Sequence, residues 1–361
     1  MYIRWPQDKA TEQDFALEPS RDDGDLIFMK AALIDRYGKN DLVRVTDVPI
    51  PSLGDMDLLV HVRAASVNPV DFKTRDGQLK VLLKYRFPLV LGNDLSGVVT
   101  AVGARVTRFK VGDAIYARLD KDRIGAFAEF AVVREDAAAA KPVNLTFEEA
   151  ASLPLVALTA WQALVELGRL SSGQRVLIHA GSGGVGTVAI QLAHHLGATV
   201  LTTVGQRNID LVKRLGADVT IDYRSARFEQ VAKDCDVVLD SAGGDTLLRS
   251  FKCVKRGGVV VSISSMLTTA FARTWGLNPL LVFAIGLMSR KTMAAARAHD
   301  VRYEYLFMRA NGEQLKQITQ LVESGAIKPV VDKVFPLDEV REALAYSESG
   351  RVTGKVVIRL P

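Results

Sequence analysis

Apolar and polar positions follow two different periods along the 361-residue chain, and the change comes near residue 152. Before it, short alternating or β-branched runs separated by turn residues predict strands, for example over 58–65 and 97–102. After it, strand-like runs alternate with segments of helical spacing, which is the pattern of βαβ units and a parallel sheet. The expected strands lie over 175–179, 199–203, 219–221, 237–239, 258–263 and 302–307, with helices between them such as 185–196 and 209–215.

The end of the chain returns to mixed elements, with helices expected over 313–324 and 337–346 and a last strand over 355–360. This tail is too short to fold alone, so we expect it to complete the first lobe. The predicted fold class is therefore α/β, with a β-rich domain over 29–152 and 309–361 and a doubly wound parallel-sheet domain over 153–308. Residues 1–28 show no periodic pattern and are expected to be a poorly ordered extension.

Composition and charge narrow the class of protein. The chain is 48% hydrophobic and 24% charged, which fits a globular protein of about two domains and excludes disorder, collagen and coiled coil. Its 46 Lys and Arg residues against 41 Asp and Glu residues give a net charge of +5 without a basic run. We therefore expect a phosphate-bearing ligand and no nucleic acid. Two cysteines without a C-x-x-C pair suggest a reducing compartment and a cytoplasmic protein.

Two apolar stretches bear on membrane association. The longest uncharged stretch, 176–206, is interrupted by six glycines and a pair of histidines, so we interpret it as buried core. The run 279–288 is too short to span a bilayer and is expected to be a buried helix, with a pocket wall or a subunit contact as the alternatives. We expect neither a secretory signal nor a membrane partner.

A glycine-rich loop follows the strand 175–179 and opens a helix. Gly181, Gly183 and Gly186 form G-x-G-x-x-G, whose glycines allow a tight turn, close approach of a pyrophosphate, and close packing of helix on strand. The helix N-terminus adds unpaired N–H groups and a positive dipole. We expect the whole loop to bind a dinucleotide through its backbone: Gly181, Ser182, Gly183, Gly184, Val185 and Gly186.

The residues after the second strand predict which dinucleotide binds. An NAD site normally has an acidic residue there for the ribose 2′-hydroxyl, but residues 202–208 contain none. Arg207 can instead pair with a 2′-phosphate, so the predicted cofactor is NADP(H). The alternative for Arg207 is a solvated residue at the start of a helix.

Other short motifs accompany the glycine loop: Ser66-Val67-Asn68-Pro69-Val70-Asp71, Leu91-Gly92-Asn93-Asp94-Leu95-Ser96-Gly97, Leu158-Thr159-Ala160-Trp161, Leu215-Gly216-Ala217-Asp218 and Gly354-Lys355-Val356-Val357. With the loop, they resemble the medium-chain dehydrogenase/reductase superfamily, and within it the zinc-independent quinone oxidoreductase and enone reductase branch. The resemblance covers residues 30–361. It implies a GroES-like β-rich catalytic domain and a Rossmann cofactor domain.

The resemblance also implies a test for zinc. Where zinc-dependent relatives place their metal ligands and the adjoining acid, this chain has Asn68, Asn93, Asp94 and Leu155. Amides and a leucine do not make a Zn²⁺ site, which needs thiolate, imidazole or carboxylate donors. We therefore expect no metal.

Without zinc, the chemistry that the resemblance implies is hydride transfer from NADPH to a quinone or to the C=C bond of an α,β-unsaturated carbonyl compound. It places Asn68 beside the nicotinamide, with an amide that ties a loop as the alternative. Tyr85 is a second catalytic candidate, a donor of a hydrogen bond or proton to the substrate, although an exposed loop tyrosine is an equal alternative.

The same resemblance assigns other residues to the cofactor. Thr159 lies near the nicotinamide ribose, Ser241 in the turn 240–244 borders the nicotinamide, and Lys355 belongs to the same site. Tyr223 and Arg351 reach the 2′-phosphate. Relatives of this branch commonly pair through the edge strand of the Rossmann sheet, so we expect a homodimer through 302–307.

Two other functions remain open at this point. One is a cofactor-binding protein without turnover, acting as a structural, RNA-binding or interaction protein. The other is an alcohol dehydrogenase with an improvised metal site. The intact glycine loop and Asn68 favour the reductase.

Overall fold

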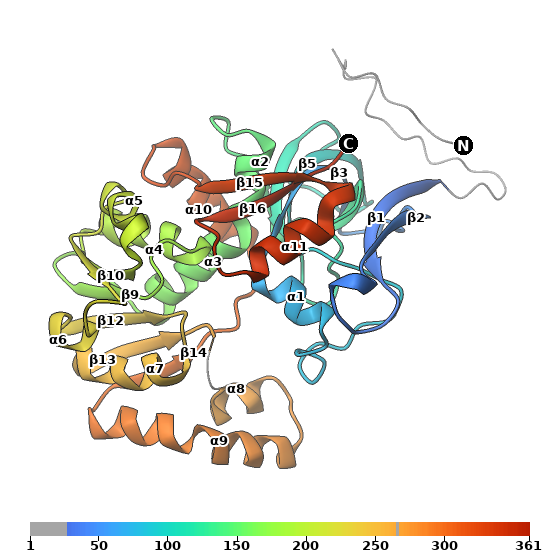
Figure 1. The fold of residues 1–361 in the computed structure, drawn as a ribbon. Helices are drawn as coiled ribbons and strands as arrows, with labels where there is room; N and C mark the ends of the chain where they lie inside the picture. Colours follow the sequence, from blue (N-terminus) through green and yellow to red (C-terminus); the bar gives the residue numbers. More distant parts are fainter. Residues whose placement is uncertain (1–26, 265–266) are drawn as a thin grey trace. The chain divides into compact units, whose positions relative to one another are not determined.

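The structure, a computed structural model, describes residues 27–264 and 267–361 (Figure 1). The predicted extension 1–28 lies outside the described residues except for Ile27 and Phe28. The described chain folds as two compact units. Unit 1 contains the residues through Leu158, Arg309–Gly325 and Pro329–Pro361, and unit 2 contains Thr159–Met308 and Ala326–Lys328.

Unit 1 is built on a seven-stranded sheet in which β3 (Asp57–Val67) is the central strand. β3 pairs antiparallel with β5 (Asp94–Val102), β7 (Phe130–Arg134) and β16 (Lys355–Arg359), so the end of the chain belongs to the same sheet as its beginning. The sheet also contains β6 (Ala114–Arg118), β8 (Ala138–Ala140) and β15 (Val331–Pro336), and a second sheet is formed by β1 (Phe28–Ile34), β2 (Arg44–Pro49) and β4 (Leu89–Val90).

Helices accompany the strands of unit 1: α1 (Pro69–Arg75), α2 (Phe147–Ala151), α10 (Gly312–Glu323) and α11 (Val340–Glu348). α1 follows β3 directly and begins after Asn68, with a proline as its first residue, where the missing N–H costs nothing. The core of the unit packs Leu58, Leu95, Phe127 and Leu344 from the main sheet, the connecting loop and α11.

Unit 2 is a parallel sheet of six strands: β9 (Arg175–Ile178), β10 (Thr199–Val204), β11 (Val219–Asp222), β12 (Cys235–Asp240), β13 (Val254–Ser262) and β14 (Arg302–Tyr305). Their order is β11-β10-β9-β12-β13-β14, the doubly wound arrangement in which strands are added outward from β9 on one side and from β12 on the other, so the strand order reverses between β9 and β12. The predicted fold class, a GroES-like domain plus a Rossmann domain, is confirmed.

The helices of unit 2 lie between these strands: α4 (Gly184–His195), α5 (Ile209–Arg214), α6 (Phe228–Val231), α7 (Gly244–Ser250), α8 (Thr269–Thr274) and α9 (Pro279–Ala298). α3 (Pro154–Trp161) crosses the division between the units and continues as a π-helical turn over Gln162–Leu167. The two cysteines, Cys235 and Cys253, are both reduced and buried in the core of this sheet.

The expectation of a buried helix over 279–288 is wrong. α9 contains this run, but Leu280, Phe283 and Met288 are 82%, 67% and 64% exposed. The buried side of α9 is formed by Ser289, Thr292 and Ala296, so the most apolar residues of the helix point outward. α9 is also long and apolar enough to cross a membrane, a test that core helices of soluble proteins pass as well. Hydropathy along the chain therefore could not tell which side of this helix is covered.

The two outer glycines of the glycine loop are required by packing, and this predicts unequal effects of alanine. A Cβ on Gly186 would lie 2.3 Å from Ala180 O and 2.7 Å from Gly181 Cα, whereas a Cβ on Gly183 would meet only Ala180 O at 3.3 Å. We expect Gly186→Ala to destabilise the protein by about 1–3 kcal/mol, as overpacking does. Gly183→Ala, the matched control, has φ −80° and ψ 172° and should change the free energy of unfolding by less than about 1 kcal/mol.

Urea denaturation of the full chain measures both changes. Equal stability of the Gly186→Ala variant and the unmodified protein would show that the helix and strand are not in close contact at this loop.

Candidate active site

The glycine loop lies between β9 and α4 and leaves one side of its backbone open. The N–H of Gly181 donates to Thr203 O at 2.9 Å, which fixes the start of the turn against β10. A Cβ on Gly181 would lie 2.0 Å from Thr202 Oγ1, so this glycine, like Gly186, is needed for packing. Gly183 precedes the first turn of α4, and a Cβ there would meet only Ala180 O, at 3.3 Å. Together with the N–H groups of the helix start, it can accept a phosphate group.

One detail of the loop differs from the expectation. The left-handed backbone angle of the turn belongs to Ala180, with φ 53°, and not to one of the three motif glycines. A residue with a Cβ adopts this conformation at a cost of order 1 kcal/mol, and such positions cluster at functional sites. The sequence motif shows where the loop lies but not which residue makes the turn.

At the end of β10, two side chains of the next strand connection lie against Gly205. A Cβ on Gly205 would be 3.5 Å from Arg224 Nη1 and 3.6 Å from Tyr223 Cε1. The Arg224 guanidinium stacks 5.1 Å from the centre of the Tyr223 ring, and this ring is 55% exposed. Arg207 lies in the short turn Gln206–Asn208 that follows Gly205. The sequence analysis named Arg207 and Tyr223 as candidates and did not name Arg224, whose only signal was its place beside Tyr223.

The turn after β12 is held by a buried carboxylate. Asp240 accepts hydrogen bonds from the N–H groups of Ala242 and Gly243, at 3.1 and 2.9 Å, and from Ser262 Oγ at 2.7 Å. Burial raises the pKa of Asp240. Ser241 Oγ donates to His179 O at 3.0 Å, so the hydroxyl of this predicted cofactor residue contacts the backbone after β9.

His179 is a buried residue that the sequence did not single out. Its Nδ1 lies 3.0 Å from Thr203 Oγ1 and its Nε2 lies 2.9 Å from Ser250 Oγ. Burial lowers the pKa of His179 to about 4, so the ring is neutral near pH 7. It ties β9 to β10 and α7 beneath the glycine loop.

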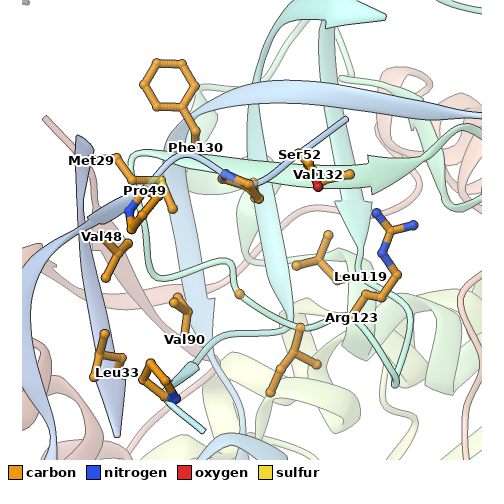
Figure 2. A pocket seen from close by; sticks show the side chains of 15 residues that line it. Met29, Leu33, Val48, Pro49, Ser52, Val90, Leu119, Arg123, Phe130 and Val132 are labelled. Atoms are coloured by element: carbon orange, nitrogen blue, oxygen red, sulfur yellow. The ribbon is translucent and has the colours of Figure 1, made fainter. Parts of the chain in front are cut away.

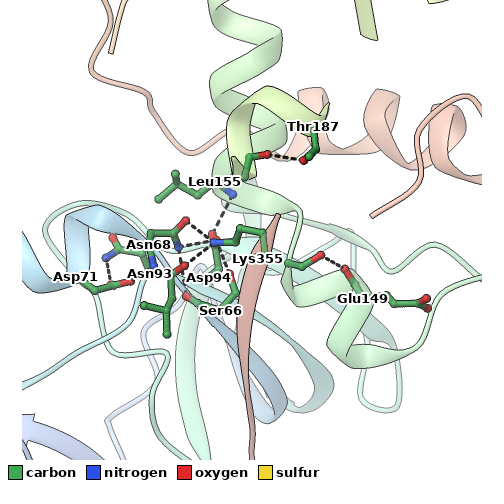
Figure 3. Close-up of polar contacts among 12 residues, drawn as sticks. Ser66, Asn68, Asp71, Asn93, Asp94, Glu149, Leu155, Thr187 and Lys355 are labelled. Carbon is green, nitrogen blue, oxygen red and sulfur yellow. Dashed lines mark hydrogen bonds and ion pairs between the residues drawn. The ribbon is translucent and has the colours of Figure 1, made fainter. Parts of the chain in front are cut away.

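In unit 1, a set of buried polar side chains surrounds Asn68, and we refer to it as the Asp94 network (Figure 3): Ser66, Asn68, Asp71, Asn93, Asp94 and Lys355. Asn68 Nδ2 donates to Asp94 Oδ2 at 2.9 Å and to Ser66 O at 3.2 Å, and Asn68 Oδ1 accepts from Lys355 Nζ at 2.6 Å. The Asn68 amide is therefore held at both ends.

The two carboxylates of the network have different partners. Asp94 accepts from Ser66 Oγ at 3.0 Å and from the N–H of Leu155 at 2.9 Å, while Lys355 Nζ lies 3.9 Å away. Asp71 accepts from the N–H of Asn68 and from Asn93 Nδ2, both at 2.7 Å. Burial raises the pKa of Asp94, although Lys355 acts to lower it, and burial raises the pKa of Asp71 to about 7.

The other predicted site residues are placed as follows. The Tyr85 hydroxyl is largely buried and donates to Lys121 O at 2.6 Å, and burial raises the pKa of this phenol. Thr159 is buried in α3, at the start of unit 2. Arg351 and Lys355 belong to unit 1, whereas the glycine loop belongs to unit 2, so their contact with a cofactor stays a prediction.

A pocket of about 430 Å³ lies elsewhere in unit 1 (Figure 2). It is lined by apolar residues that include Met29, Val90 and Phe130. Its charged residue Arg123 forms a two-pronged ion pair with Asp57, at 2.8 and 3.0 Å. None of the predicted site residues lines this pocket, so it carries no part of the candidate chemistry.

The Asp94 network does not fit a zinc ion. The places of the expected ligands are taken by Asn68, Asn93 and Leu155, whose side chains carry no thiolate, imidazole or carboxylate. Both oxygens of Asp94 accept hydrogen bonds, and the nearby cation is the Lys355 ammonium group. Within residues 27–264 and 267–361, no group of three or more His, Cys, Asp or Glu residues could hold a metal.

Comparison with known proteins shows which families and relatives the chain is similar to. Residues 54–143 match the family described as alcohol dehydrogenase GroES-like domain, and residues 215–358 match the one described as zinc-binding dehydrogenase. The chain is 37% identical to the protein named NAD(P)H oxidoreductase RTN4IP1, mitochondrial, of Bos taurus, covering 92% of this chain and 89% of the relative. It is 37% identical to 2-methylene-furan-3-one reductase of Solanum lycopersicum, covering 91% of this chain and 79% of the relative.

Solved structures agree. The quinone oxidoreductase from Coxiella burnetii matches with a TM-score of 0.79 and 33% identity, covering 93% of this chain and all of that one. The Escherichia coli quinone oxidoreductase complexed with NADPH matches with a TM-score of 0.76 and 25% identity, covering 91% and 99%.

The expectation of a cytoplasmic protein is wrong by this comparison, because the matching oxidoreductase of Bos taurus is named mitochondrial and other relatives are named chloroplastic. Cysteine usage reports the redox state of a compartment, and an organelle address is a signal read by a receptor, so the two are independent.

The glycine loop, the two-unit fold and alignments at 37% identity that cover nine-tenths of the chain lead to one conclusion: this protein belongs to the medium-chain dehydrogenase/reductase superfamily, among the relatives of quinone and enone oxidoreductases.

Proposed function

We propose that the protein is an NADPH-dependent oxidoreductase that transfers hydride to quinones or to the C=C bond of α,β-unsaturated carbonyl compounds, without zinc. The observation that carries this proposal is the Asp94 network. At the place where a metal-dependent relative would bind its ion, this network has the amides of Asn68 and Asn93 and the ammonium group of Lys355, next to Leu155. Conjugate reduction suits such a site, because the negative charge spreads onto a carbonyl oxygen that hydrogen bonds can stabilise.

The cofactor assignment is NADP(H). It is supported by the relative named NAD(P)H oxidoreductase and by the matching structure that contains NADPH. When bound, this cofactor supplies the hydride. The glycine loop would hold its pyrophosphate at Gly183 and the start of α4, and Arg207, Tyr223 and Arg224 would surround its 2′-phosphate. We expect Thr159, Ser241 and Arg351 to complete the cofactor site.

For the substrate, we assign Asn68 to the position beside the nicotinamide. In the proposed reaction, the protein holds the hydride acceptor next to the cofactor. The β-carbon of an enone then receives the hydride, and the α-carbon receives a proton. The Tyr85 hydroxyl donates to Lys121 O, so a proton from Tyr85 would require this hydrogen bond to break. Water is the simpler proton source.

We also propose a homodimer. β14 is the last strand of its sheet and has one unpaired edge among the described strands, and α9, which contacts β14, exposes Leu280, Phe283 and Met288. Covering an edge strand with a two-fold partner removes this exposure. Tyr303 is buried in the core of its own sheet, whereas the Arg302 and Glu304 side chains of β14 and the apolar side chains of α9 are exposed and can meet a partner.

The central test is NADPH oxidation against a panel of quinones, enones and alcohols, measured at 340 nm. We expect turnover with quinones or enones that survives a strong zinc chelator. Gly183→Val should fold, because a Cβ there meets only Ala180 O, at 3.3 Å, but it should lose NADPH binding, because the branched side chain would occupy the space that the pyrophosphate needs. NADPH binding without turnover on any acceptor would support the non-catalytic alternative, and loss of activity that Zn²⁺ restores would contradict the zinc-free mechanism.

Cofactor choice gives a second prediction. Removing one arginine that pairs with the 2′-phosphate should weaken NADPH binding by about 10- to 100-fold and leave NADH nearly unaffected, since a charged hydrogen bond contributes roughly 1.5–3 kcal/mol. Arg207→Gln and Arg224→Gln are the test variants. Arg214→Gln on the exposed side of α5 is the control. Equal affinities of the unmodified protein for NADPH and NADH would refute the assignment.

Oligomeric state gives a third prediction. Light scattering at micromolar concentration should give the mass of a dimer, and Phe283→Glu should shift it to a monomer, because a buried contact cannot accommodate an unpaired carboxylate. Val81→Glu, at an equally apolar and exposed position in unit 1, is the control. A monomer of the unmodified protein would rule out the dimer.

A further inference from the structure

Lys355 is a buried cation at the start of β16. Its side chain is only 6% exposed, and its ammonium group donates to Val67 O at 2.7 Å and to Asn68 Oδ1 at 2.6 Å. Lysine is almost never buried to this extent unless it is paired. The nearest carboxylate, Asp94, lies 3.9 Å away, so the hydrogen bonds of Lys355 are to Val67 and Asn68 and not to its counterion.

These contacts fix the orientation of the Asn68 amide. An ammonium group has only donors, so the end of the amide that faces Lys355 must be Oδ1. A carboxylate that accepts must face Nδ2, and Asp94 Oδ2 lies 2.9 Å from that atom. Rotating the amide by 180° would set donor against donor and acceptor against acceptor. Lys355 and Asp94 together therefore permit one of the two orientations, as Figure 3 shows.

The charge of Lys355 lies among other buried ionisable groups. Two fully buried carboxyl groups face it, Asp94 from β5 and Asp71 from α1, and Arg118 of β6 lies near enough to both to interact electrostatically. Burial lowers the pKa of Lys355 to about 8, although Asp94 and Asp71 act to raise it.

We propose that Lys355 is a positioning residue for the reduction: it holds the Asn68 amide in one orientation beside the cofactor, and it provides the positive charge that balances Asp94 in a site without a metal. This inference rests on the proposed function, because it gives Asn68 its place next to the nicotinamide. It replaces direct cofactor contact as the role of Lys355. The Asn68 amide, and not Lys355, would meet the reacting groups.

The first test separates kcat from KM. In Lys355→Met, the Asn68 amide loses its fixed orientation, and we expect kcat to fall by about 10- to 100-fold with KM for NADPH within about twofold of normal. Lys333→Met, an exposed lysine on the neighbouring strand β15, is the control and should change neither. An unchanged kcat would overturn the proposal, as would a raised KM for NADPH with kcat unchanged, which would indicate direct cofactor contact.

A second variant covers the case in which Lys355→Met does not fold. The double variant Lys355→Met with Asp94→Asn removes one charge of each sign, so it avoids an uncompensated buried carboxylate. It should regain stability without regaining kcat. A double variant with the normal kcat would show that Lys355 only balances charge, and the positioning role would be wrong.

The pH profile of the unmodified enzyme needs no variant. If the ammonium form positions Asn68, kcat must fall as the pH rises through about 8, the pKa of Lys355, while circular dichroism shows that the protein stays folded. The double variant should lack this alkaline limb. A kcat that stays constant up to the pH at which the protein unfolds would overturn the proposal.

A measurement independent of turnover distinguishes this inference from the proposed function. With selective ¹⁵N-asparagine labelling, the side-chain amide of Asn68 should shift with pH near 8, and this shift should be lost in the double variant. If no acceptor is reduced, the proposed function fails, but this signal still decides the role of Lys355. An Asn68 amide insensitive to pH would overturn it.

Discussion

Unit 1 depends on one buried carboxylate. The partners of Asp94 come from three distant stretches of chain: Ser66 and Asn68 before α1, the N–H of Leu155 at the start of α3, and Lys355 of β16. An ion without water is costly by several kcal/mol, and removing one partner of a buried pair costs about 3–5 kcal/mol. All of these groups must therefore be present together. The polar residues around Asp94, which are the candidates for chemistry in unit 1, therefore also hold distant parts of this unit together.

A second constraint acts in unit 2, where steric contacts, and not charge, determine which residues the glycine loop can contain. Gly181 and Gly186 have no room for a Cβ, since helix and strand approach within contact distance there. At Gly183 a Cβ would meet only Ala180 O, at 3.3 Å, so packing does not exclude a side chain there as it does at the other two glycines. Within this one motif, Gly181 and Gly186 are therefore needed for packing, and Gly183 is the glycine that we assign to phosphate binding. Beneath it, the neutral His179 joins β9 to its neighbours without adding a charge near the phosphate site.

The surroundings of Asn68 in unit 1 and the turn after β12 in unit 2 are both held in place by hydrogen bonds to buried charged side chains. In each, groups that could adopt more than one orientation are held by buried, hydrogen-bonded neighbours: the Asn68 amide by Lys355 and Asp94, and the turn after β12 by Asp240. Preorganised dipoles stabilise developing charge without having to reorient during the reaction. A site that lacks the strong field of a metal gains most from such preorganisation, and the hydrogen bonds around Asn68 and Asp240 provide it.

The sequence by itself determined the fold class and the glycine loop, because both follow from short-range patterns: the change in hydrophobic period near residue 152 and the sterics of glycine between a strand and a helix. It also singled out Asn68, Tyr223 and Arg207 through local motifs. It could not show that Lys355 bonds to Asn68, 287 residues away, or that Arg224 stacks on Tyr223 beside Gly205. Nor could it tell that the apolar residues of α9 point outward. Those features depend on which distant surfaces meet, and only the tertiary structure decides which surfaces meet.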